Sequence, residues 1–171
     1  MPKAVLLSVQ PKWCELIASG KKTVEVRKTK PKLLTPFKCY IYQTRKTWVY
    51  NIYSRIADWQ GKVIGEFVCD FFDEFEPSPK SVKFRRFRAL GDTRLTLREI
   101  IEYLNGQKGY GWHISDLVIY DKPKKLSVFR KPCVNEVYCE SCAMYNNFYD
   151  SCGNKALRLQ RPPQSWCYVE V

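Results

Sequence analysis

A chain of 171 residues, 45% of them hydrophobic and 15% aromatic, can form one packed core and is too apolar for an intrinsically disordered protein. Its 29 lysines and arginines outnumber 17 acidic residues, and the formal net charge of +12 favours polyanionic partners. No apolar run approaches the ~20 residues of a membrane span, and Met1 to Leu7 lacks the length and cleavage site of a signal peptide. We therefore expect a cytoplasmic protein with no membrane partner.

The first part of the chain predicts short strands and one helix. Ala4–Val9 is an apolar run typical of a buried strand. Pro11 suits the first turn of a helix that Gly20 would end. The alternating stretches Thr23–Arg27 and Phe37–Gln43 predict two more strands.

The middle of the chain predicts two further strands. Lys62–Phe75 has the composition of one long strand, in which Gly65 marks a bulge or bend. Val82–Arg88 alternates apolar and basic residues. Its arginines could follow a phosphate backbone, or they could form a solvated basic strand.

Thr96–Leu104 is the clearest helix, with Glu99 at the capping-box position and Asn105-Gly106 as its stop. After this helix, Gly111–Ser115 and Leu117–Tyr120 predict two strands. Lys122–Lys125 predicts a basic turn, and Ser165–Val171 predicts the closing strand. Many short strands and two helices indicate an α+β fold built on a small β-barrel with flanking helices.

The most informative segment runs from Gly20 to Arg27. Side chains alternate along a strand, so Thr23, Glu25 and Arg27 share one face while the two valines between them face the core. An acid and a base two residues apart on one face can hold a polar ligand in a defined geometry. The alternative is a solvated strand edge with a surface ion pair of little energetic consequence.

Two blocks of this sequence resemble the ASCH domain family, which is related to PUA domains. The first comprises Ala4–Trp13, with the sequence Ala-Val-Leu-Leu-Ser-Val-Gln-Pro-Lys-Trp, and Gly20–Arg27, with the Gly-x-Lys-x-x-Glu-x-Arg hallmark. The second is Tyr110–Pro123, which reads Tyr-Gly-Trp-His-Ile-Ser-Asp-Leu-Val-Ile-Tyr-Asp-Lys-Pro. The resemblance covers residues 1 to about 129 and the closing strand around Trp166.

The resemblance implies one ASCH domain over residues 1–171, with a PUA-like barrel beside a cleft and a Cys-rich loop insertion at residues 130–160. ASCH domains are generally regarded as RNA-binding or RNA-modifying. The leading hypothesis is therefore that the basic cleft binds RNA or a modified nucleotide. A protein-interaction module of a transcription complex is a different reading, which predicts weak affinity for RNA.

The resemblance places three hallmark side chains in the cleft. Lys22 would contact a phosphate or a base carbonyl, and Arg27 could make a bidentate contact to a phosphate or base edge. Glu25 could accept a hydrogen bond from an exocyclic amine or act as a base. Gln10 and Lys12, directly after the first strand, would line the same opening.

One branch of the family is an amidohydrolase that removes acetyl groups from acetylated cytidine. Its motif is Gly-x-Lys-Thr-x-Thr-x-Arg, and Lys22 and Thr23 match it. Glu25 stands at the nucleophilic threonine, and Asp92-Thr93 stands near the position of a distant catalytic glutamate. A carboxylate cannot simply replace the activated hydroxyl as nucleophile, which argues against this activity. For the alternative that the protein is a hydrolase, the catalytic candidates are Lys22 and Glu25.

Two later segments carry further candidates. Trp112, flanked by glycine, could stack on a base, or it could belong to the core. His113 could be the general base of a ribonuclease, an activity reported for some ASCH proteins, or a structural residue. Near the end of the chain, a Pro-Pro pair could lay Arg161 and Ser165 across the cleft, or it could only connect to the closing strand.

Cysteines divide into two groups. Three of the eight, Cys14, Cys39 and Cys69, lie in apolar stretches and predict small buried side chains. The others gather towards the C-terminus, where the C-x2-C spacing suits a closed structural zinc site with four thiolate ligands. The predicted ligands are Cys133, Cys139, Cys142 and Cys152, with Cys167 as a possible substitute, and the alternative is a loop with free thiols.

Overall fold

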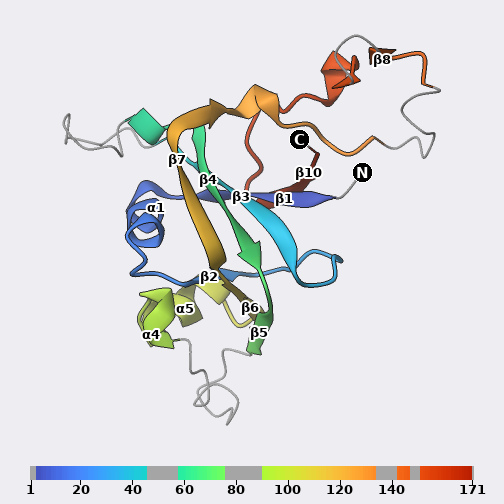
Figure 1. The fold of residues 1–171 in the computed structure, drawn as a ribbon. Coiled ribbons are helices and arrows are strands. Elements are labelled where there is room, and N and C mark those ends of the chain that lie inside the picture. The colour runs from blue at the N-terminus through green and yellow to red at the C-terminus, as the bar shows by residue number, and fades with distance from the viewer. Residues whose placement is uncertain (1–2, 46–57, 76–89, 134–141, 147–150, 171) are drawn as a thin grey trace.

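The computed structural model describes residues 3–45, 58–75, 90–133, 142–146 and 151–170, and Figure 1 shows their arrangement. The larger sheet has five strands in the order β10-β1-β3-β4-β7. In chain order these strands are β1 (Ala4–Val9), β3 (Phe37–Gln43), β4 (Lys62–Cys69), β7 (Ser115–Lys125) and β10 (Trp166–Val169).

A second sheet of three strands, in the order β2-β6-β5, lies below the larger one in Figure 1. Its strands are β2 (Val24–Arg27), β5 (Phe72–Phe75) and β6 (Gly109–His113). The helices are α1 (Pro11–Ala18), the short α4 (Leu90–Thr93) and α5 (Leu97–Leu104). The C-terminal part holds two 3-10 turns, η1 (Leu126–Val128) and η3 (Lys155–Leu157), and a hairpin of β8 (Tyr145–Asn146) and β9 (Ser151–Cys152).

The first strand is apolar because both of its faces are covered. β1 pairs in parallel with β3, with Val5 opposite Cys39, and antiparallel with β10 on its other side. Val5 and Leu7 pack in one core cluster, and Leu6 packs with Phe129 in another. A strand that is buried on both faces needs a nearly continuous apolar run, so the sequence predicted it correctly.

α5 is held against the smaller sheet by its apolar face. Ile100 and Leu104 pack with Val26 of β2 and Phe75 of β5. Thr96 accepts a hydrogen bond from the Glu99 amide at 3.2 Å, and the Glu99 side chain accepts one from the Thr96 amide at 2.7 Å, which completes the predicted capping box. This packing presents the last turn of α5, including Tyr103, beside β2.

The predicted strand Lys62–Phe75 is two strands in two different sheets. β4 ends at Cys69, and the chain turns at Asp70 and Phe71 before β5 begins in the smaller sheet. Gly65 does mark an irregularity, since the register of β4 with β7 shifts beside it. The prediction failed because apolar composition does not show which partner strand receives the hydrogen bonds.

The α+β class is confirmed, but the described strands form separate sheets and do not close into the expected barrel. The predicted turn at Lys122–Lys125 is also wrong, since these residues extend β7 and pair with the start of β4. Among the described strands β7 lies at the edge of its sheet, where lysines and a proline are tolerated. The predicted strand Val82–Arg88 lies outside the described residues. No helix that the structure describes is long and apolar enough to cross a membrane.

Candidate functional site

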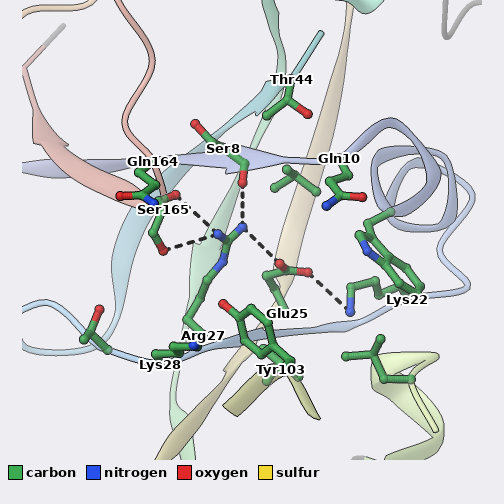
Figure 2. A pocket seen from close by; sticks show the side chains of 15 residues that line it. Ser8, Gln10, Lys22, Glu25, Arg27, Lys28, Thr44, Tyr103, Gln164 and Ser165 are labelled. Carbon is green, nitrogen blue, oxygen red and sulfur yellow. Dashed lines mark hydrogen bonds and ion pairs between the residues drawn. The ribbon is translucent and has the colours of Figure 1, made fainter. Parts of the chain in front are cut away.

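A pocket of about 690 Å³ lies where the two sheets approach each other. Its walls come from the end of β1 and the start of α1, from β2, from α5 and from the connector before β10. Figure 2 shows its side chains. Five of the residues predicted from the sequence line it together: Gln10, Lys22, Glu25, Arg27 and Ser165.

The hallmark side chains form a continuous chain of ion pairs inside this pocket (Figure 2). One carboxylate oxygen of Glu25 lies 3.3 Å from the Lys22 ammonium, and the other lies 3.0 Å from Nη2 of Arg27. Lys22, Glu25 and Arg27 are only 2%, 7% and 6% exposed. The charges are thus held in a region of low dielectric constant, where unpaired ions would be costly.

The Lys22 ammonium is saturated by protein oxygens. Besides the Glu25 carboxylate, it donates to the carbonyl oxygens of Val24 at 2.8 Å and Thr93 at 2.6 Å. A lysine has three N–H donors, so all of them have partners here. Burial lowers the pKa of Lys22, because desolvation disfavours the charged ammonium, and the Glu25 carboxylate opposes this shift.

Arg27 joins the smaller sheet to the larger one. Its Nη2 donates to the Ser8 carbonyl of β1 at 2.9 Å, and its Nη1 donates to the carbonyl and hydroxyl oxygens of Ser165 at 3.3 and 3.4 Å. With the Glu25 contact, both terminal nitrogens are fully used. Nε is buried and has no hydrogen-bond partner among the described residues.

The connector before β10 forms a wall of the pocket because it is bonded to β1. The Ser8 hydroxyl donates to the Pro163 carbonyl at 2.6 Å, and the Ser8 amide donates to the Ser165 carbonyl at 2.9 Å. Ser165 therefore lies in the pocket, as expected, together with its neighbour Gln164. Arg161 is exposed and is not part of the lining.

Two other predicted residues lie outside the lining. Lys12 is exposed, with its ammonium 4.5 Å from the ring centroid of Trp13, which does line the pocket. Trp112 is 0% exposed and packs edge-on against Phe37 and Phe72. The structure therefore places Trp112 in the core, the alternative that the sequence left open, and its ring offers no face to a base.

His113 is also remote from the pocket lining. Its Nε2 lies 2.8 Å from a carboxylate oxygen of Asp73, and its ring stacks on Phe71 with the centroids 3.6 Å apart. These contacts agree with the structural reading of His113. They offer no support for a role as general base in the pocket.

The sequence analysis missed Tyr103 of α5, which lines the pocket beside Glu25 and Arg27 (Figure 2). Burial raises the pKa of the Tyr103 hydroxyl, with opposing smaller effects of the Arg27 and Glu25 charges. A signal was present: Tyr103 immediately precedes Leu104, so it flanks the buried face of an amphipathic helix. Lys28, also missed, is exposed and holds its ammonium 5.3 Å from the Tyr103 ring centroid.

The region expected to supply a catalytic glutamate does reach the pocket, but with backbone atoms. The Thr93 carbonyl accepts from Lys22, and the Asp92 carbonyl accepts from the Thr23 amide at 3.0 Å. Glu25, at the position of the amidohydrolase threonine, is committed to two cations. The lysine of that motif is therefore present without its usual nucleophile.

The three cysteines of the apolar stretches are buried, as the sequence predicted. Cys14, Cys39 and Cys69 are 0% exposed, and burial raises the pKa of Cys69 to about 12. Cys142 and Cys152 lie at the base of the β8–β9 hairpin, where Tyr145 donates to the Cys142 carbonyl at 2.9 Å and pairs with Cys152.

The predicted ligand Cys139 lies outside the described residues. The residues that the structure describes contain no group of three or more side chains placed to hold a metal ion. Cys167 lies on β10 opposite Leu6, and burial raises the pKa of its thiol.

Residues 7–71 match the family model of the ASCH domain. The crystal structure of ASCH from Zymomonas mobilis is similar, with a TM-score of 0.55 and 22% identity over 72% of this chain and 73% of that chain. A serine-to-alanine mutant protein of the same ASCH has a TM-score of 0.61 and 19% identity, over 98% of this chain and 88% of that chain. No curated protein matches. Residues 7–71 thus match an ASCH domain, and the chain shares its fold with the solved ASCH structures.

Proposed function

We propose that this protein binds RNA or a nucleotide in the pocket formed around Lys22, Glu25 and Arg27. The observation that carries the proposal is the gathering of these buried charges with Gln10 and Ser165 around one cavity. Ligand pockets typically measure about 300–1,000 Å³, and few convergent polar groups give them specificity. The net charge of +12 would attract a polyanion to the surface around the pocket.

Fluorescence anisotropy with a labelled single-stranded RNA at rising salt tests this proposal. We expect the logarithm of the binding constant to fall linearly with the logarithm of the salt concentration. Arg27→Lys loses the forked contacts to Ser8 and Ser165 and should weaken binding about tenfold. The control is Arg98→Lys, which keeps the same charge at an exposed site of α5.

An absence of RNA and nucleotide binding at low ionic strength would contradict the proposal. It would favour the protein-interaction reading, which expects weak affinity for RNA. If Arg27→Lys and Arg98→Lys changed the RNA affinity equally, the RNA would bind outside the pocket.

A hydrolase acting on a modified nucleoside is the second candidate. The lowered pKa of Lys22 favours it, because a larger fraction of the amine is then unprotonated and able to act as a general base. We rank the hydrolase function below binding, because Glu25 is held in two ion pairs and no threonine stands at its position. Incubation with acetylated cytidine and with labelled RNA separates the readings. Turnover that Lys22→Met abolishes would support catalysis, and binding without turnover would oppose it.

The wider domain assignment belongs to the same proposal. We take residues 1–171 as one PUA-like ASCH domain with a Cys-rich insertion at residues 130–160. Four thiolates from Cys133, Cys139, Cys142 and Cys152 would hold one structural zinc ion in that insertion. Two observations support this site. One is the C-x2-C spacing, and the other is the hairpin in which Cys152 pairs with Tyr145, a residue three positions after Cys142.

A further inference from the structure

The charged groups inside the pocket already satisfy one another. All three donors of Lys22 and all four terminal hydrogens of Arg27 have oxygen partners from the protein. Both carboxylate oxygens of Glu25 are paired with these cations. A phosphate entering here would meet the Glu25 carboxylate and would have to displace existing bonds. The interior is therefore unsuited to a dianion, although the surface of the protein is basic.

The polar groups that remain suit an uncharged ligand. Gln10, Thr44 and Gln164 line the pocket with amide and hydroxyl groups (Figure 2). Such groups both donate and accept, as the edge of a nucleobase does. The Nε–H of Arg27 is a donor with no acceptor among the described residues. That nitrogen is buried, so an inserted base would reach it only after the Arg27 side chain shifted.

An aromatic ring borders the same space. Tyr103 lines the pocket and is 40% exposed, and in Figure 2 its ring lies beside the Glu25–Arg27 pair. A base stacked on an aromatic side chain typically gains about tenfold or more in affinity. The Lys28 ammonium, 5.3 Å from the centroid of this ring, is exposed to solvent at the opening. This ammonium lies over the Tyr103 ring, so a base that stacks on this face would displace it and leave Lys28 free to pair with the phosphate outside.

We infer that the pocket takes the base of one unpaired nucleotide, stacked on Tyr103, while the phosphate stays outside beside Lys28. The inference rests on the proposed function and makes it narrower. It excludes duplex RNA as the preferred ligand, because a paired base cannot enter a pocket without leaving its stack. The inference divides the binding free energy into two contributions. Stacking on Tyr103 should not depend on salt, whereas the contact of Lys28 with the phosphate should weaken as salt rises.

The test measures binding of a short labelled RNA, single-stranded or annealed to its complement, over a range of salt concentrations. Tyr103→Leu should weaken single-strand binding about tenfold with an unchanged salt slope. Tyr103→Phe should restore most of the affinity, because it keeps the ring. Lys28→Gln should reduce the salt slope by about one and weaken binding less. The duplex should bind at least about tenfold more weakly than the single strand.

A competition experiment tests the interior directly. An uncharged nucleoside should displace the labelled RNA, and inorganic phosphate at the same ionic strength should not. Displacement of the RNA by phosphate but not by the nucleoside would overturn the inference. It would also be overturned if duplex and single strand bound equally well and Tyr103→Leu had the affinity of the wild type. In those cases salt-dependent RNA binding would still support the proposed function. Failure of every RNA and nucleotide to bind would overturn both.

Discussion

Glu25 controls the electrostatics of the pocket. Each of its carboxylate oxygens faces one cation, so it keeps two buried positive charges from repelling each other. Ion pairs of this kind contribute little net stability compared with apolar packing, but the loss of one partner leaves an uncompensated buried charge.

Glu25→Gln should lower the free energy of unfolding by about 3 kcal/mol, because Lys22 and Arg27 would remain buried without a carboxylate. Urea unfolding followed by circular dichroism measures the change. Glu102→Gln is the control, since its ion pair with Arg98 is 61% and 88% exposed and contributes little. Equal midpoints for the two variants would show that the Glu25 pairs are not important for stability.

The lowered pKa of Lys22 predicts a pH dependence of stability. Between this lowered pKa and the ordinary value of 10.5, the unfolded chain binds more protons at Lys22 than the native protein does. The contribution of Lys22 to the free energy of unfolding should therefore rise with pH through that window. Other groups titrate there too, so the measured quantity is the difference between wild type and Lys22→Met from pH 8 to pH 10.5. A flat difference would contradict the prediction.

At the scale of elements, α5 links local sequence to the site. Its capping box and its stop at Asn105, which has a φ of 49°, set the ends of the helix. Ile100 and Leu104 then fix its rotation against the smaller sheet. Because the rotation is fixed, Tyr103 is directed towards the pocket, and a register shift of the helix would remove it.

The pairing of β4 with β7 depends on Gly65. A Cβ at this position would clash with the backbone carbonyl of Val118 on the neighbouring strand. Gly65→Ala should therefore lower the free energy of unfolding by about 1–3 kcal/mol, as overpacking against rigid backbone usually does.

Thermal and urea unfolding measure this effect. Gly91→Ala is the matched control, since a Cβ at Gly91 meets nothing within 4 Å. An equal response of the two variants would mean that the strands separate without cost at Gly65.

At the scale of the whole molecule, the pocket lies at the junction of two sheets. β2 of the smaller sheet carries Glu25 and Arg27, while β1 of the larger sheet carries the carbonyl of Ser8 that Arg27 binds. The last connector of the chain closes the same side through Ser165. Residues far apart in the chain thus form one site, so the pocket exists only in the folded protein.

The proposed zinc site is tested on the whole purified protein. Elemental analysis should find about one zinc per chain, and a strong chelator should lower the thermal midpoint, because metal affinity contributes to folding. Cys142→Ser should lose the metal. Cys167→Ala is the control and should keep it, since Cys167 belongs to the larger sheet. A zinc content well below one equivalent in the wild type would end the proposal.

Local signals account for the elements that were predicted well. The run Ala4–Val9, the alternation of Phe37–Gln43 and the capping box of α5 are all written in neighbouring residues, and the structure has them at those positions. The division of Lys62–Phe75 into two strands was not predictable in this way. It depends on the choice between two sheets, which involves residues far apart in the chain.

The sequence by itself determined the charged groups of the pocket: a lysine just before one strand, and a glutamate and an arginine two residues apart on that strand, in a basic chain. Only the tertiary structure decided what those charges do, since the partners of Lys22 and Arg27 include Thr93, Ser8 and Ser165. It also placed Trp112 in the core and Tyr103 at the pocket. The reason is physical: strand alternation is a local property, whereas burial and hydrogen-bond partners arise from packing of distant segments.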